Sequence, residues 1–121
     1  MRILFFDIEI FTNYFLVVVY DPYTKEYTLF QLWEVDGKVI INDLHRLLKF
    51  LESEKDSYFC GYNSLGYDMN ILTAIVKEKF TTNQQIKEFN DFLIGSEWSI
   101  YREQDLCNKT LDLMLVNNYG P

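Results

Sequence analysis

Two neighbouring stretches, RILFFDI at residues 2–8 and YFLVVVY at residues 14–20, decide the fold of this chain. The first is a short apolar run rich in isoleucine and phenylalanine, which predicts a buried strand. The second has the density of valine and aromatic residues that is typical of strands. The turn sequence DPYT at 21–24 follows, with proline preset for the second turn position. Residues 25–33 (KEYTLFQLW) then alternate polar and apolar side chains, so we expect a third strand that completes an antiparallel hairpin.

Further along the chain, the pattern mixes helices with strands. Asn42 is suited to cap a helix, and leucines follow it at helical spacing. The predicted elements are a helix at 43–54, a strand at 57–61, helices at 70–80 and 83–94, an irregular stretch at 95–108 and a fifth strand at 110–116. This order predicts an α/β fold with a mixed five-stranded sheet and flanking helices. No helix follows the fifth strand to cover that face of the sheet. We therefore expect residues 1–121 to be a single domain that lacks its C-terminal helix.

Composition limits the class of protein. The 121 residues are 49% hydrophobic and 17% aromatic, which suits one folded domain and not a disordered chain. The net charge of −7 argues against a domain that holds nucleic acid on a large basic surface. It does not exclude an enzyme that meets phosphate groups through bound cations, a protein-binding domain or a nucleic-acid mimic. No apolar run is long enough for a membrane span or a signal peptide, so the expected location is the cytoplasm, of a bacterium or a phage-infected host cell.

Cysteine and histidine chemistry has little support. Cys60 lies in an apolar strand-like run, where a free buried thiol is the common state, and neither Cys60 nor Cys107 has a partner at zinc spacing. His45 is the only histidine and falls in a helical pattern. Catalysis by a serine or cysteine nucleophile with a histidine base is therefore not indicated.

The first candidate site is the pair Asp7 and Glu9. Residues i and i+2 of a strand point to the same face, so both carboxylates lie side by side. Their repulsion, together with desolvation at the end of a buried strand, is best explained by a cation between them. Carboxylate oxygens suit Mg²⁺ or Mn²⁺. The alternative is that both acids are simply solvated at a strand end.

The second candidate is the segment GYNSLGYDMNIL at 61–72, which joins a strand to a helix. Asp68 stands where a helix N-cap belongs, and capping alone would account for it. Asn63 could serve only as an Asx-turn residue, and Tyr67 could be ordinary core. Taken singly, each of these residues has a structural explanation.

Taken together, the two segments resemble a known family. FFDIEIF on the first strand, followed by Asn63-x(3)-Tyr67-Asp68, is similar to the first two motifs of DEDD-type 3′→5′ exonucleases, which have a ribonuclease H-like fold. Within that family, the sequence looks most like the proofreading domains of family B DNA polymerases and phage-encoded exonucleases. The resemblance implies that Asp7, Glu9 and Asp68 are catalytic ligands of two Mg²⁺ or Mn²⁺ ions. It also implies that Asn63 and Tyr67 lie near the 3′-terminal nucleotide.

The family also uses a fourth acid, in a Y-x(3)-D or H-x(3)-D motif on a helix after the fifth strand. Tyr101 to Asp105 reads Y-x(3)-D, but it precedes that strand, and Asp112 lies on the strand itself. The chain could therefore be a fragment of a longer exonuclease or polymerase, a truncation completed by a second chain, or a degenerate domain. We expect weak metal binding and little or no nuclease activity from these residues alone.

Two function classes stay open. The first is a domain for DNA proofreading or replication that hydrolyses phosphodiester bonds at the 3′ end of single-stranded DNA, alone or joined to a polymerase. The second is a non-catalytic exonuclease-like protein that binds a host or polymerase partner or mimics nucleic acid. Stabilisation by Mn²⁺ separates the two, because a ligand that binds the native state raises its melting temperature.

Overall fold

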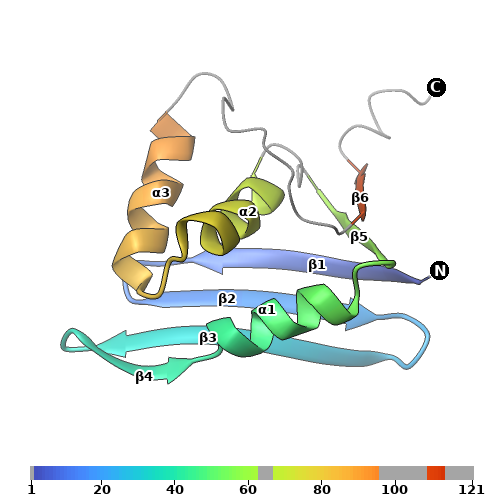
Figure 1. Cartoon of the computed structure of the whole chain (residues 1–121), viewed down its shortest axis with the longest axis horizontal. Helices are drawn as coiled ribbons and strands as arrows, with labels where there is room; N and C mark the ends of the chain where they lie inside the picture. The colour runs from blue at the N-terminus through green and yellow to red at the C-terminus, as the bar shows by residue number, and fades with distance from the viewer. Residues whose placement is uncertain (1, 63–66, 96–108, 114–121) are drawn as a thin grey trace.

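A computed structural model describes residues 2–62, 67–95 and 109–113. Nine elements are found in this part of the chain (Figure 1). The strands are β1 (Ile3–Ile10), β2 (Tyr14–Asp21), β3 (Glu26–Val35), β4 (Lys38–Asn42), β5 (Tyr58–Gly61) and β6 (Lys109–Asp112). The helices are α1 (Leu44–Ser53), α2 (Asp68–Glu78) and α3 (Asn83–Gly95).

The six strands form one mixed sheet in the order β4-β3-β2-β1-β5-β6. The first four strands are joined by antiparallel pairings of β1 with β2, β2 with β3 and β3 with β4. β5 runs parallel to β1, and β6 runs parallel to β5. The predicted antiparallel hairpin and the mixed strand directions are therefore confirmed.

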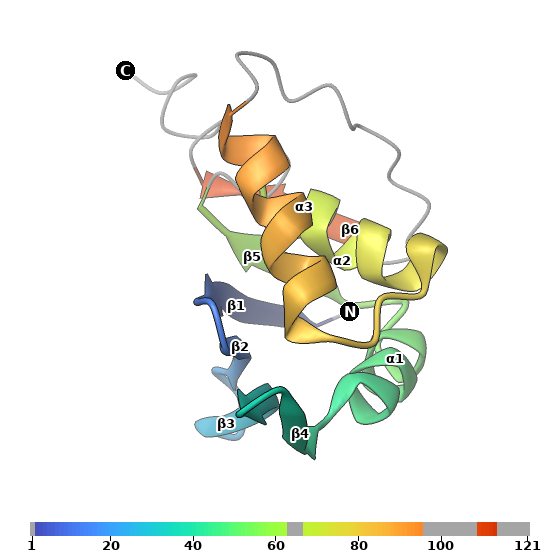
Figure 2. The same ribbon diagram turned by 90° about the vertical axis from the view of Figure 1, so that its left-hand side faces the viewer.

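All three helices lie on the same side of the sheet (Figure 2). They cover alternate residues of the central strands, among them Leu4, Phe6 and Ile8 of β1 and Phe15, Val17 and Val19 of β2, which are at most 6% exposed. The opposite face carries the intervening side chains, and none of the described helices covers it. α2 lies in the middle of the helical layer and is buried from Met69 through Ile75. The hydrophobic core therefore lies between the sheet and the layer of helices.

β1 differs from the prediction in one respect. We expected residues 2–8 to form a buried strand, but only every second side chain is buried, and Phe5 is 41% exposed. The apolar run hides this alternation, because Phe5 and Phe6 face opposite sides of the sheet. Asp7 and Glu9 share the side of Phe5 and are exposed.

The five-stranded prediction was wrong by one strand, β4. Asp36 (φ 52°) and Gly37 (φ 74°) form a two-residue turn with positive φ at both positions, and β4 returns from it to pair with β3. An Asp-Gly pair followed by Val39 and two isoleucines is a strong hairpin signal, since its twist matches that of the strands. The expected continuation of the last strand past residue 113, and the absence of a helix after it, lie outside the described residues.

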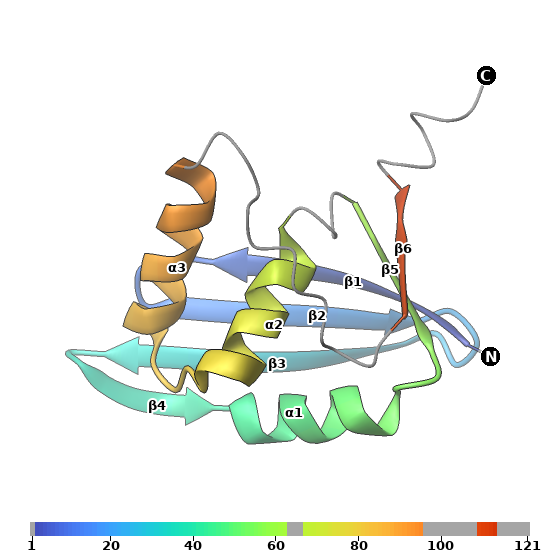
Figure 3. The ribbon, with the colours of Figure 1, turned by 45° about the horizontal axis from the view of Figure 1, so that its top comes forward.

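The helices begin and end close to the predicted positions. α1 starts at Leu44 with Asp43 at the N-cap position, so the prediction of Asn42 as the N-cap is wrong by one residue, although the Asn42 Oδ1 accepts a hydrogen bond from the Leu44 amide at 3.2 Å. α2 starts two residues earlier than expected, which places Asp68 inside its first turn. α3 packs against α2 and contacts β1, β2 and β3 (Figure 3).

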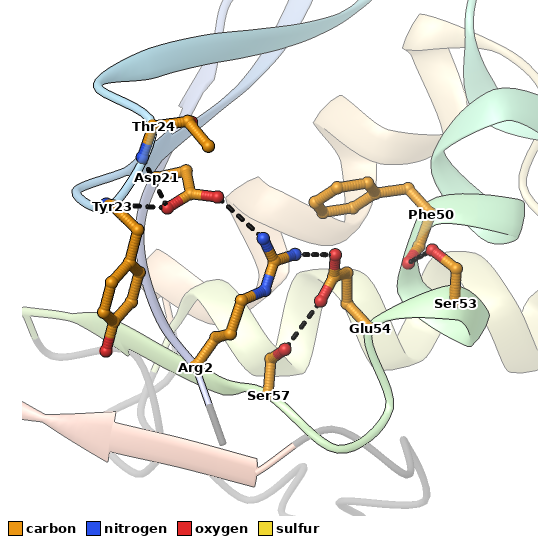
Figure 4. A network of polar contacts seen from close by, with 8 residues as sticks. All are labelled: Arg2, Asp21, Tyr23, Thr24, Phe50, Ser53, Glu54 and Ser57. Atoms are coloured by element: carbon orange, nitrogen blue, oxygen red, sulfur yellow. Dashed lines mark hydrogen bonds and ion pairs between the residues drawn. The ribbon is translucent and has the colours of Figure 1, made fainter.

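A polar network ties the amino end of β1 to two connections of the sheet (Figure 4). The Arg2 guanidinium pairs with Asp21 at 2.7 Å and with Glu54. Asp21 also accepts hydrogen bonds from the amides of the β2–β3 turn, and Glu54 accepts one from the Ser57 hydroxyl at 2.6 Å. One arginine therefore links the β2–β3 turn to the end of α1 and the start of β5.

Candidate active site

The acid pair lies where β1 continues beyond its parallel neighbour. Ile3, Leu4 and Phe5 pair with successive residues of β5, so this register places Phe6 beside Gly61, the last residue of that strand. Asp7 and Glu9 follow, with β2 on one side and no strand on the other among the described residues. In open α/β sheets, such a position at the carboxyl end of neighbouring parallel strands is where ligands usually bind.

β1 is also the strand at which the chain changes direction across the sheet. β2, β3 and β4 lie on one side of β1, and β5 and β6 lie on the other. The connections that leave the carboxyl ends of β1 and β5 therefore diverge at this place. A topological switch point of this kind keeps the strand ends accessible.

Asp7 and Glu9 interact directly. The pKa of Glu9 is raised, first because its carboxyl group shares a hydrogen bond with Asp7, then because of slight burial and the negative charge of Asp7. A divalent cation held between the two carboxylates would relieve this repulsion. The pair therefore fits a divalent cation by its chemistry.

Tyr67 and Asp68 come to the same region from the helical layer. Asp68 is the first residue of α2 and is 6% exposed, and Tyr67 immediately precedes the helix. The expected role of Asp68 as the N-cap residue is wrong, because the cap position is occupied by Tyr67. A carboxylate in the first turn still interacts favourably with the positive end of the helix dipole. Asp68 is therefore a buried carboxylate at the amino end of α2, the helix that follows β5 in the chain.

Tyr67 connects the acid pair electrostatically with the start of α2. Burial, followed by the negative charges of Asp68, Glu9, Asp7 and Asp91 in that order, raises the pKa of Tyr67 to about 12. Charges shift a pKa in this way only when they lie near the titrating group. The hydroxyl of Tyr67 therefore lies in the combined field of the three predicted catalytic acids, and it stays protonated at neutral pH.

α3 supplies a residue that the sequence motifs did not reveal. The Tyr67 hydroxyl donates a hydrogen bond to Oδ1 of Asn90, which is 4% exposed. The helical pattern contained a signal, because Asn90 falls on the face of α3 that buries Ile86 and Leu93. A polar residue on an apolar helix face needs a partner inside the protein. Asn90 and its neighbour Asp91 therefore belong to the surroundings of the site.

The described residues do not form a complete metal centre. Among them, no group of three or more His, Cys, Asp and Glu side chains could hold a metal ion. The structure thus brings Asp7 and Glu9 together on β1 and does not bring Asp68 into one ligand set with them. Asn63 and the segment 101–105 lie outside the described residues, as does the side chain of Asp112.

Comparison of the chain with known protein families, with curated proteins and with solved structures finds no match. Two residues singled out in the sequence analysis are described. Cys60 is buried on β5, and His45 is exposed on α1. No helix in the described part of the chain has the length and apolar character needed to cross a membrane.

Proposed function

We propose that this chain forms the core of a 3′→5′ exonuclease domain that hydrolyses phosphodiester bonds with divalent cations, in DNA proofreading or replication. One observation carries the proposal: Asp7 and Glu9 lie on one face of β1 beyond the end of β5, close enough for Asp7 to raise the pKa of Glu9, and both charges also act on Tyr67. With Asp68, which directly follows Tyr67, these are the four described residues of the two sequence motifs. The acid pair therefore interacts electrostatically with a residue some 60 positions later in the chain.

The strand order supports a ribonuclease H-like fold. Without β4, the order is β3-β2-β1-β5-β6, with β2 antiparallel to the other four strands. An antiparallel meander followed by parallel strands on the far side of β1 is the arrangement that the resemblance implies. In that arrangement, the first acidic motif lies on the central strand and the second follows the adjacent parallel strand.

The roles of the residues follow from their positions. Asp7 and Glu9 would hold Mg²⁺ or Mn²⁺, and Asp68 would approach the second ion directly or through water. Bound cations would supply a metal-activated water and stabilise the leaving 3′ oxygen. Tyr67 stays protonated at neutral pH, so its hydroxyl serves binding and orientation and not proton abstraction. Its place between the acid pair and α2 suits contact with the terminal nucleotide of single-stranded DNA.

The strength of metal binding limits the expected activity. The acid pair offers two carboxylates in contact, whereas the nucleases it resembles use four acids. Each ion would therefore keep more water ligands and bind more weakly than in a complete site. We expect the 121 residues alone to bind Mn²⁺ weakly and to trim DNA slowly or not at all.

Thermal unfolding with and without Mn²⁺ tests the proposal. Binding to the native state raises the melting temperature by mass action, and Asp7→Asn should abolish the increase because it removes one carboxylate without changing shape. Glu52→Gln, at an exposed position of α1, is the matched control and should keep the increase. No increase in the unmodified chain, or an equal increase in Asp7→Asn, would remove the metal site. Robust Mn²⁺-dependent trimming by these 121 residues that Asp7→Ala abolishes would contradict the expected low activity.

The open face of the sheet favours a second candidate, a non-catalytic protein-binding domain. Trp33 and Phe5 are each 41% exposed, and Tyr27 is 69% exposed. Tyr27 lies against Tyr20, with ring centroids 4.7 Å apart. Exposed aromatic side chains in neighbouring rows are typical of protein interfaces. Mutation of Trp33 would weaken binding of such a partner and leave the stabilisation by Mn²⁺ unchanged. The two functions are therefore separable.

A further inference from the structure

Asn90 occupies an unusual place on α3. It is 4% exposed on a helix face that otherwise buries apolar residues, and its amide contacts the hydroxyl of Tyr67 across the interface with α2. Burial of an amide costs free energy unless both of its polar ends are satisfied. Asn90 meets this condition with Tyr67 at one end and Asp91 at the other. The residue therefore joins the candidate site to the surface of α3.

The two contacts fix the orientation of the amide. The Asn90 Nδ2 donates to the Asp91 Oδ1 at 3.2 Å, and the same carboxylate oxygen accepts from the Lys87 Nζ at 2.5 Å. A carboxylate that pairs with a lysine is ionised and can only accept hydrogen bonds. The amino group of Asn90 must therefore face Asp91, and its carbonyl oxygen must face Tyr67. The hydroxyl of Tyr67 can satisfy that oxygen only by donating its proton.

We propose that Asn90 is a positioning residue that directs the Tyr67 proton toward α3 and leaves the phenol oxygen as a hydrogen-bond acceptor in the candidate active site. This inference rests on the proposed exonuclease function and adds to it. The chain of contacts runs from Lys87 through Asp91 and Asn90 to Tyr67, and each donor has one acceptor in it. A hydroxyl held in this way does not reorient freely when a ligand binds.

The direction of the proton selects the chemistry of the ligand. An oxygen that has already donated its proton can accept from a sugar hydroxyl or a water, but it repels a phosphate oxygen, which only accepts. Nearby carboxylates of Asp7, Glu9 and Asp68 disfavour an unneutralised phosphate for the same reason. Tyr67 is therefore suited to meet the free 3′-hydroxyl of a terminal nucleotide.

Binding of a short oligothymidylate in the presence of Mn²⁺ tests this inference on the full chain. The probes are oligonucleotides ending in a 3′-hydroxyl and in a 3′-deoxy sugar, measured by fluorescence anisotropy. Loss of one hydrogen bond weakens binding by about three- to tenfold. Tyr67→Phe and Asn90→Leu should each cause such a loss with the 3′-hydroxyl probe and little further loss with the 3′-deoxy probe. Asn90→Leu in a Tyr67→Phe background should add nothing, because both changes remove the same contact.

Asn83→Leu is the matched control, since Asn83 is the other asparagine of α3 with almost no exposure and it makes no contact with Tyr67 among the described hydrogen bonds. It should leave the discrimination between the probes intact. If Asn90→Leu weakens oligonucleotide binding equally in the unmodified chain and in the Tyr67→Phe background, Asn90 has only a structural role and the inference is overturned. An unmodified chain that binds neither probe in Mn²⁺ would instead overturn the proposed function, from which this inference follows.

Discussion

Removal of the charge on Asp7 should stabilise the metal-free protein. The raised pKa of Glu9 means that the folded chain holds its proton more tightly than the unfolded chain. The pair therefore contributes stability below the ordinary glutamate pKa, and this contribution is lost as the pH rises through the raised pKa of the folded state. The negative charge of Asp7 repels the ionised form of Glu9 in the folded protein. Asp7→Asn keeps the size of the side chain and removes this repulsion.

The magnitude follows from the exposure of the pair. Both side chains are exposed on the open face of the sheet, so solvent screens their repulsion, and exposed charge pairs are worth about 0.2–1 kcal/mol. A domain of this size gains about 1–4 °C in melting temperature from such a change. The gain should shrink as the pH falls to about 4, because protonation of Glu9 relieves the same repulsion. Without metal at neutral pH, Asp7→Asn is therefore the more stable protein.

Mn²⁺ should reverse this order. At ten times its dissociation constant, a ligand adds about 1.4 kcal/mol to the stability of the native state, which exceeds the repulsion that the variant relieves. Calorimetry in EDTA and in Mn²⁺ at pH 7, repeated in EDTA at pH 4, measures both effects. A melting temperature of Asp7→Asn that equals or falls below that of the unmodified chain in EDTA would refute the reasoning. It would mean that the two acids do not repel each other in the folded protein.

Three further predictions concern stability and are measured by urea unfolding. Arg2→Ala should lower the free energy of unfolding by about 1–2 kcal/mol, because it leaves the carboxylates of Asp21 and Glu54 facing each other at 15% and 16% exposure; an unchanged midpoint would show that solvent already screens them. Asn83→Leu should raise the free energy of unfolding by about 1 kcal/mol, because neither polar atom of that buried side chain has a hydrogen-bond partner among the described residues. A decrease would point to a contact that the leucine breaks. Lys79→Gly should raise it by up to about 1 kcal/mol, because Lys79 ends α2 at φ 55°, where glycine is unstrained, and a loss of stability would show that the lysine side chain contributes more than the backbone strain costs.

Local patterns predicted most of the fold. The hairpin of β2 and β3, the amphipathic α1 and the two later helices follow from periodicity and turn residues, which act over a few positions. β4 was missed although its Asp-Gly turn is a local signal, because the strand has only five residues and most of them are exposed. The two-sided character of β1 was not predictable from its apolar run. Whether Phe5 or Phe6 faces the helices depends on how β1 pairs with strands that come later in the chain.

The site was only partly predictable for the same reason. Asp7, Glu9, Tyr67 and Asp68 belong to contiguous motifs and could be found one segment at a time. Asn90 could not, because its role depends on the packing of α3 against α2, and no motif spans the 23 positions that separate it from Tyr67. An asparagine on an apolar helix face indicates only that some partner exists. Identification of that partner requires the tertiary structure.

The register of β1 and β5 explains how residues from both sides of the sheet can act on one ligand. Asp7 and Glu9 point away from the helices, whereas Tyr67 and Asp68 belong to the helical layer. A continuous sheet would separate these groups, since a paired neighbour blocks passage between its faces. Among the described residues, β5 ends beside Phe6 and no strand pairs with β1 there, so the sheet is open next to the acid pair. The negative charges of Glu9 and Asp7 contribute, after burial and Asp68, to the raised pKa of Tyr67. A β5 extended by two paired residues would close the opening, and a ligand could then meet the acid pair or Tyr67 but not both.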